Sequence, residues 1–92
     1  MIVRIASEGQ YRLSDEQVGR LQKLDDGLIA AATDADATAM HNTLNQIVGF
    51  VRSEGQALAL DDLSSSDVIL PSPDATPDEI RDLMREDGLI PG

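Results

Sequence analysis

The sequence predicts a single α+β domain, residues 1–92, with a small antiparallel sheet packed on a helical hairpin and a short helix near the C-terminus. Three observations lead to this prediction. Residues 1–13 form two strand-like runs around a turn, residues 14–54 carry two apolar stripes with helical spacing, and residues 76–84 open with a helix-capping signal. A chain of 92 residues has the length of one domain.

A β-hairpin is predicted at the N-terminus. Residues 1–5 are rich in β-branched side chains, and residues 11–13 alternate apolar and polar ones. Gly9 lies between the two runs and suits a turn. Tyr11, just past the turn, is expected to anchor a face of the sheet. Because an isolated hairpin is only marginally stable in water, it must pack against another element.

Two amphipathic helices are predicted next. Ser14 and Gln17 form a capping box at the start of the first helix. Asp34 and Asp36 are expected to end this helix and cap the second, and Gly55 has the position of a C-terminal glycine. The apolar stripes are Val18, Leu21, Leu24, Leu28 and Ala31, then Met40, Leu44, Ile47, Val48 and Val51. The short connection predicts an antiparallel helix pair.

The rest of the chain, after residue 55, adds strand candidates and a helix. Residues 57–60 and 68–70 are both able to extend the hairpin, and the acidic residues 61–67 between them resemble a loop. Thr76 and Glu79 form a capping box with Pro77 at the first helical position. Gly88 is expected to end this helix and let Leu89 pack on Met84. The expected buried edge is Ile80, Leu83 and Met84.

Composition narrows the protein class. Hydrophobic residues make up 41% of the chain and aromatic residues 2%, so the core must be aliphatic. The absence of cysteine excludes disulfides, thiolate metal sites and cysteine nucleophiles. No apolar run approaches the ~20 residues of a membrane span. The apolar start is also too short for a signal peptide, so we expect a cytoplasmic protein.

The net charge of −10 is concentrated in the second part of the chain. Residues 1–53 carry five basic and seven acidic side chains, a balance of −2, whereas residues 54–92 carry two basic and ten acidic ones, a balance of −8. Such a surface repels phosphates and anionic lipids, so direct nucleic-acid binding is not expected. The acidity serves solubility, or it attracts a partner with a basic patch.

No catalytic or metal-binding pattern is present. The single histidine, His41, falls on a predicted helix with no nucleophile placed beside it. Asp34 begins a stretch like a calcium loop, but the required glycine and glutamate positions hold Ala39 and Asn45. We expect no catalytic residue, metal or cofactor, and therefore a protein that is not an enzyme.

The least regular and most acidic segment, residues 61–74, is the predicted contact surface for a partner. The candidate partner-binding residues are Asp61, Asp62, Asp67, Val68, Ile69 and Asp74. The alternative for this segment is that its residues only complete the sheet.

Five stretches together resemble one known family. In chain order they are residues 1–13 (MIVRIASEGQYRL), 24–26 (LDD), 67–71 (DVILP), 74–76 (DAT) and 87–92 (DGLIPG). In this order and spacing the chain resembles the PspA-associated domain (PspAA) family over essentially its whole length. The resemblance implies an accessory or regulatory partner of phage shock protein A, a coiled-coil, membrane-remodelling relative of ESCRT-III proteins, in the envelope-stress response. It supplies no catalytic residues.

We therefore expect a non-enzymatic adaptor that binds a PspA-like coiled coil, with no membrane insertion of its own and membrane contact only through that partner. One alternative is an acidic anti-repressor or nucleic-acid mimic that binds a basic transcription regulator. Another is a small hydrolase, which requires a pocket holding His41 beside serine or aspartate. Oligomeric state stays open, because an exposed sheet edge can pair with itself.

Overall fold

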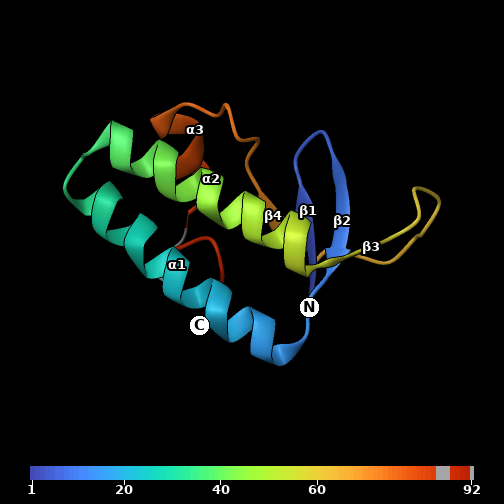
Figure 1. Ribbon diagram of the computed structural model, residues 1–92. Helices are drawn as coiled ribbons and strands as arrows, with labels where there is room; N and C mark the ends of the chain where they lie inside the picture. Colours follow the sequence, from blue (N-terminus) through green and yellow to red (C-terminus); the bar gives the residue numbers. More distant parts are fainter. Residues whose placement is uncertain (85–87, 92) are drawn as a thin grey trace.

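A computed structural model describes residues 1–84 and 88–91 and confirms the predicted fold class. Two long helices form a hairpin beside a small sheet, and a short helix follows (Figure 1). The elements are β1 (Ile2–Ile5), β2 (Gly9–Arg12), α1 (Asp15–Thr33), α2 (Ala37–Glu54), β3 (Gln56–Ala57), β4 (Val68–Leu70) and α3 (Pro77–Leu83).

The sheet has four strands in the order β3-β2-β1-β4. The hairpin is antiparallel, and β3 pairs antiparallel with β2, but β4 pairs parallel with β1, so the sheet is mixed rather than wholly antiparallel. The predicted strand at residues 68–70 joins the sheet at one edge. Of the candidate at residues 57–60 only Ala57 is strand, and it forms β3 with Gln56 at the other edge. Since β3 and β4 lie at opposite edges, the chain between them must cross the sheet.

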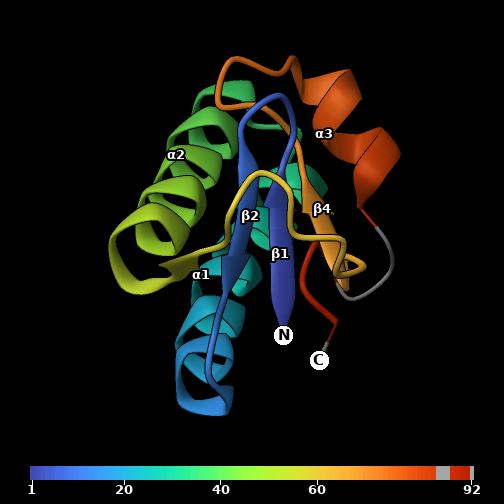
Figure 2. The same ribbon diagram turned by 90° about the vertical axis from the view of Figure 1, so that its right-hand side faces the viewer.

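The two faces of the sheet have different neighbours. Figure 2 shows α1 and α2 behind the sheet, whereas the connection from β3 to β4 passes in front of it. Side chains alternate accordingly: Ile5 and Leu70 are buried, whereas Arg4 and Ile69 are exposed. We call the face away from the helices the outer face.

The core between the sheet and the helices is aliphatic, as predicted. All five positions of the second apolar stripe are buried, and both aromatic residues, Tyr11 and Phe50, are only partly buried against the core. The buried apolar residues are Val3, Ile5, Leu13, Leu21, Leu28, Ala31, Met40, Leu44, Ile47, Val48, Val51, Val68, Leu70, Ala75, Ile80, Leu89 and Ile90.

The predicted helix starts are confirmed. The Ser14 hydroxyl accepts from the Gln17 N–H at 3.2 Å, and the Gln17 side chain accepts from the Ser14 N–H at 2.9 Å. The same reciprocal box joins Thr76 and Glu79 at the start of α3. Asp36 caps α2 through the Ala39 N–H at 3.0 Å. These bonds satisfy N–H groups that have no partner within the helix.

Two glycine roles differ from the prediction. Gly55 does follow α2, but its φ is −77°, so left-handed geometry is not the reason for glycine there. A Cβ at this position would lie 2.5 Å from the Val51 carbonyl oxygen and 3.0 Å from Tyr11 Cβ, so close packing requires glycine. In the hairpin turn the left-handed residue is Ser7, with φ 65°, and Gly9 belongs to β2.

The end of α3 was predicted wrongly. The helix ends at Leu83 with Met84 as its C-cap, well before Gly88. Leu83 is 42% exposed rather than buried, whereas Ile80 is fully buried as expected. Residues 85–87, on which part of the predicted helix fell, lie outside the described residues.

A polar clamp joins the hairpin to α2. The Glu8 carboxylate, on the hairpin turn, accepts from Arg52 Nε at 3.0 Å to each of its oxygens and also pairs with Arg52 Nη2. Tyr11 Oη donates to the same carboxylate at 3.1 Å. The hydrogen bond from Arg52 lowers the pKa of Glu8. Burial, followed by the hydrogen bond to Glu8, raises the pKa of Tyr11.

We expect this clamp to make stability depend on pH. Because the folded pKa of Glu8 is lowered, the contribution is present above the ordinary value of 4.5 and is lost as pH falls through the lowered value. Arg52→Gln should therefore cause a small loss of thermal stability at pH 7 that shrinks as the pH falls below 4.5. Thermal unfolding of both proteins as a function of pH checks this. A difference that persists unchanged at low pH contradicts it.

Candidate partner-binding surface

The predicted contact residues are divided among a loop, the strand that follows it and the turn before α3. Residues 58–67, here called the crossover loop, run across the outer face from β3 to β4 (Figure 2). Asp61, Asp62 and Asp67 belong to this loop, and Val68 and Ile69 belong to β4. Asp74 lies farther along, in the turn before α3.

The crossover loop is tied to the sheet at both ends. Leu58 N–H donates to the Gln10 carbonyl at 2.9 Å at one end. At the other end Asp67 N–H donates to the Ile2 carbonyl at 2.8 Å, and the Asp67 carboxylate accepts from Ile2 N–H at 2.7 Å. Asp67 therefore extends the pairing of β4 with β1, which is a structural role.

A second set of polar contacts fastens the returning limb of the loop to the outer face. Ser66 Oγ donates to Gln10 Oε1 at 2.9 Å, and Arg4 Nε donates to Ser66 Oγ at 3.3 Å. Gln10 is buried, with 8% of its surface exposed, so the loop supplies the hydrogen bond that its side-chain oxygen needs.

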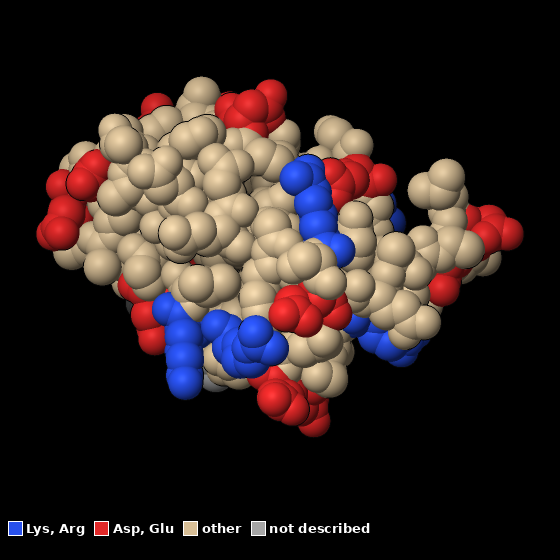
Figure 3. Space-filling view, viewed as in Figure 1, with Lys and Arg blue, Asp and Glu red and all other residues tan. Residues whose placement is uncertain are grey.

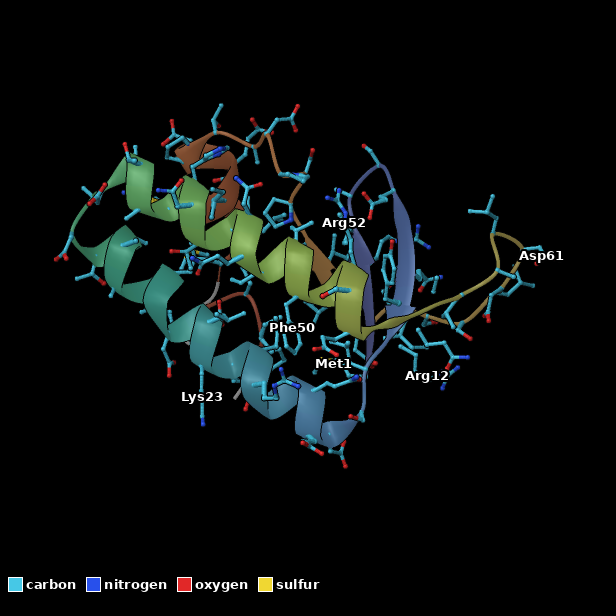
Figure 4. The ribbon with its side chains drawn as sticks, viewed as in Figure 1. Met1, Arg12, Lys23, Phe50, Arg52 and Asp61 are labelled. Atoms are coloured by element: carbon cyan, nitrogen blue, oxygen red, sulfur yellow. The ribbon has the colours of Figure 1, made fainter. Side chains whose placement is uncertain are left out.

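The tip of the loop is a hydrogen-bonded turn. Asp62 N–H donates to the Ala59 carbonyl at 3.0 Å, and Ser64 N–H donates to Asp62 Oδ1 at 2.8 Å. Hydrogen bonds from Ser64 lower the pKa of Asp62. Asp62 thus shapes the turn, whereas Asp61 lies at its tip and points away from the domain (Figure 4).

Two leucines on this turn are almost completely solvated. Leu60 and Leu63 are each 96% exposed, and they are the most exposed of the large apolar side chains that the structure describes. Sequence reasoning named the neighbouring aspartates but missed these leucines. A signal was present, because leucine is unusual in a run of aspartate and serine. We call residues 59–64 the leucine turn.

A second feature is an open hollow of about 330 Å³ beside β4. It brings together Asp67, Val68 and Ile69 among the predicted residues, but not Asp61, Asp62 or Asp74. Ile69 is 52% exposed, whereas Val68 is 6% exposed and belongs to the core. The lining residues are Ser66, Asp67, Val68, Ile69, Leu83, Gly88, Leu89 and Pro91.

Asp74 has a local structural role. Its carboxylate accepts a hydrogen bond from the Ser72 hydroxyl, and this bond lowers the pKa of Asp74. Ala75 N–H donates to the Ser72 carbonyl at 2.9 Å in the same turn. These bonds orient the chain into the capping box of α3.

One wall of the hollow is held in place by a buried carboxylate. Asp25, on α1, is 1% exposed, and its two oxygens accept from Leu89 N–H at 3.1 Å and Ile90 N–H at 3.0 Å. Gln22 Nε2 also donates to the Pro91 carbonyl at 2.7 Å. We call this set of contacts the C-terminal clasp. It fixes residues 88–91 against α1 and buries Leu89 and Ile90.

His41 is exposed on α2, and its Nε2 lies 3.0 Å from Asn45 Nδ2. It is not in a pocket beside serine or aspartate, which contradicts the hydrolase hypothesis.

Within residues 1–84 and 88–91, no group of three or more histidine, cysteine or acidic residues is arranged to hold a metal. In the same residues, no helix has the length and apolar character needed to cross a membrane.

The fold and the loop define the structural class of the protein. It is a small α+β domain with a helical hairpin on one face of its sheet and an ordered crossover loop on the other.

A family model for the PspA-associated protein matches residues 1–92, the whole chain, so the protein belongs to that family. Comparison with curated proteins and with solved structures gave no match.

Proposed function

We propose that the protein is a non-enzymatic accessory protein of the phage-shock, envelope-stress system that binds a PspA-like coiled-coil protein. The observation that carries this proposal is the match of the PspA-associated protein family along the whole chain. The family is named for association with PspA, so a PspA-like protein is the natural partner. The proposed location is the cytoplasm, with membrane contact only through that partner.

The surface of the domain supports a binding role. Leu60 and Leu63 are large apolar side chains exposed together on the leucine turn, and Ile69 is a separate one exposed on β4. Apolar side chains grouped on a surface are typical of contact sites for other macromolecules. The acidic side chains of the crossover loop suit a partner that carries lysine or arginine, because opposite charges speed the encounter.

The described titratable groups with shifted pKa values support the non-enzymatic part of the proposal. Enzyme sites commonly gather such groups in a cleft. Here the shifts have local causes. Hydrogen bonds from Arg52, Ser64 and Ser72 lower the pKa values of the carboxyl groups of Glu8, Asp62 and Asp74, respectively. Each of these contacts fixes a turn or joins two elements.

The charge pattern favours a protein partner over mimicry of nucleic acid. A mimic needs carboxylates in a dense, regular array that replaces phosphates. On the face seen in Figure 3, acidic side chains stand in small separate groups with lysine and arginine between them.

Binding should be direct and partly dependent on salt. We expect the chain to bind a PspA-like coiled coil at low ionic strength and to bind it more weakly at about 1 M salt, where charges are screened beyond about 3 Å. Apolar contacts should keep some binding at high salt. Isothermal titration calorimetry at both salt concentrations checks this. Absence of binding at low salt rejects the partner, and equal affinity at both concentrations rejects charge steering.

A further inference from the structure

We propose that the leucine turn is the contact surface, and that Leu60 and Leu63 insert into an apolar groove between partner helices whose rim carries lysine or arginine. This inference rests on the proposed function and adds the place of contact and the chemistry of the partner's surface.

The exposure of these two side chains is the first argument. Single exposed leucines are common on protein surfaces, but here two lie on one turn, each 96% exposed. Neither leucine belongs to the hydrophobic core, which is formed by the sheet, the helices and a few residues of the segments next to them, including Leu89 and Ile90. The turn therefore carries apolar surface that the fold of this domain does not use.

The order of the turn is the second argument. Asp62 N–H and Ser64 N–H both make hydrogen bonds inside the turn, to Ala59 and Asp62 respectively. The limbs on either side are bonded to Gln10. Side chains presented by an ordered turn lose less conformational freedom on binding than those of a free loop. The turn is thus preorganised for contact.

The position of the turn is the third argument. In Figures 1 and 2 the crossover loop projects from the outer face, away from α1 and α2. Asp61 marks the farthest point of the loop in Figure 4. A long helical partner is able to reach this tip without meeting the helical layer of the domain.

Charge selects the occupant. Asp61 and Asp62 lie between the two leucines in the sequence. The positive charge of Arg12, on β2, already attracts the Asp62 carboxylate. Asp61 at the tip is therefore the carboxylate best placed to meet a basic rim. A second copy of this chain, or an anionic membrane, would bring like charges together, because the chain carries a net charge of −10. A basic, apolar helical groove is the surface that complements the turn.

The apolar contact is tested with the double variant Leu60→Gln/Leu63→Gln. Because both residues are solvated, we expect an unchanged circular dichroism spectrum and midpoint of thermal unfolding. The affinity for a PspA-like coiled coil should fall by about tenfold or more, as for loss of anchor residues at an interface. Ala30→Gln is the control, since it places the same polar side chain at an exposed site on α1, outside both the crossover loop and the hollow beside β4. It should change affinity by less than about twofold.

The charge contribution is tested with Asp61→Lys. We expect a slower association rate and a weaker dependence of that rate on salt, because a charge that faces the basic rim is reversed. Asp34→Lys makes the same change of net charge at the opposite end of the molecule, where α1 meets α2, and should leave the rate nearly unchanged (Figure 1).

The outcomes separate this inference from the proposed function. If the wild-type chain binds the coiled coil and the double leucine variant binds equally well, the inference is wrong and the proposed function stands. If the wild-type chain does not bind, both are wrong. Sedimentation velocity and flotation with anionic vesicles test the other occupants. Loss of self-association or of vesicle binding in the double variant would assign the turn to those occupants and overturn the inference.

Discussion

Asp25→Asn should lower the free energy of unfolding by about 2–4 kcal/mol, because the C-terminal clasp loses a charged, doubly accepting carboxylate. An asparagine has a single side-chain oxygen and accepts from Leu89 N–H or Ile90 N–H, but its amide group then faces the other N–H. Both of these donors are bonded to Asp25 in the folded protein. The side chain is 1% exposed, so water does not replace the lost bond.

Asp26→Asn is the matched control for this prediction. Asp26 is the next residue on the same helix, and it is exposed. The same chemical change there should alter stability by no more than about 0.5 kcal/mol. Urea unfolding of the three proteins gives the comparison. Equal losses in the two variants would mean that removing a charge from α1, rather than opening the clasp, is responsible.

Gly88→Ala should cost about 3 kcal/mol, from two sources that act together. Gly88 has φ +85°, a left-handed conformation that side chains with a Cβ rarely adopt. An added Cβ would also lie 2.8 Å from both Cγ and Oδ1 of Asp25. Asp25 is held by its bonds to the clasp, so it cannot move aside without breaking them.

Gly49→Ala provides a control with the opposite sign. Gly49 is exposed in α2, and a Cβ there would meet nothing within 4 Å. Because alanine favours helix more than glycine does, this change should stabilise the protein by about 0.5–1 kcal/mol. If Gly88→Ala proves neutral in the same unfolding assay, the close contact between Gly88 and Asp25 does not exist in solution.

The double variant Asp25→Asn/Gly88→Ala should lose less unfolding free energy than the sum of the two single losses, since both changes affect one set of contacts.

Local signals in the sequence were enough to predict most elements of the fold. Capping boxes fixed the starts of α1 and α3, and the apolar stripe of α2 matched its buried face at every position. Residues 68–70 formed the expected strand. These features depend on neighbours within a few residues, where spacing and capping rules are strong.

Long-range contacts were not predictable in the same way. The stretches LDD and DGLIPG were assigned to two different helical segments and to separate parts of a family resemblance, yet the structure joins them through Asp25 and the N–H groups of Leu89 and Ile90. A side chain that bonds to backbone leaves no complementary side chain to find in the sequence. Gly88 was likewise assigned to the end of α3. In the structure its left-handed conformation occurs in the C-terminal clasp, directly before the two residues whose N–H groups bond to Asp25.

For the segment predicted to contact a partner, the loop itself was predicted in part, but the contacts and exposure of its side chains were not. Residues 61–67 form a loop as expected, but the loop already begins at residue 58, and Asp62, Asp67 and Asp74 are hydrogen-bonded within the fold. Leu60 and Leu63 were missed because leucine is ordinarily a core residue, and its exposure depends on where the rest of the chain packs.

Mapping the contact residues by nuclear magnetic resonance is the most direct test of a partner-binding role for the crossover loop. The backbone amide signals of the ¹⁵N-labelled chain would be followed during titration with a PspA-like coiled coil. We expect changes concentrated in residues 58–69, with the exposed faces of α1 and α2 nearly unaffected. Changes centred on those helices, with the leucine turn undisturbed, would contradict this role.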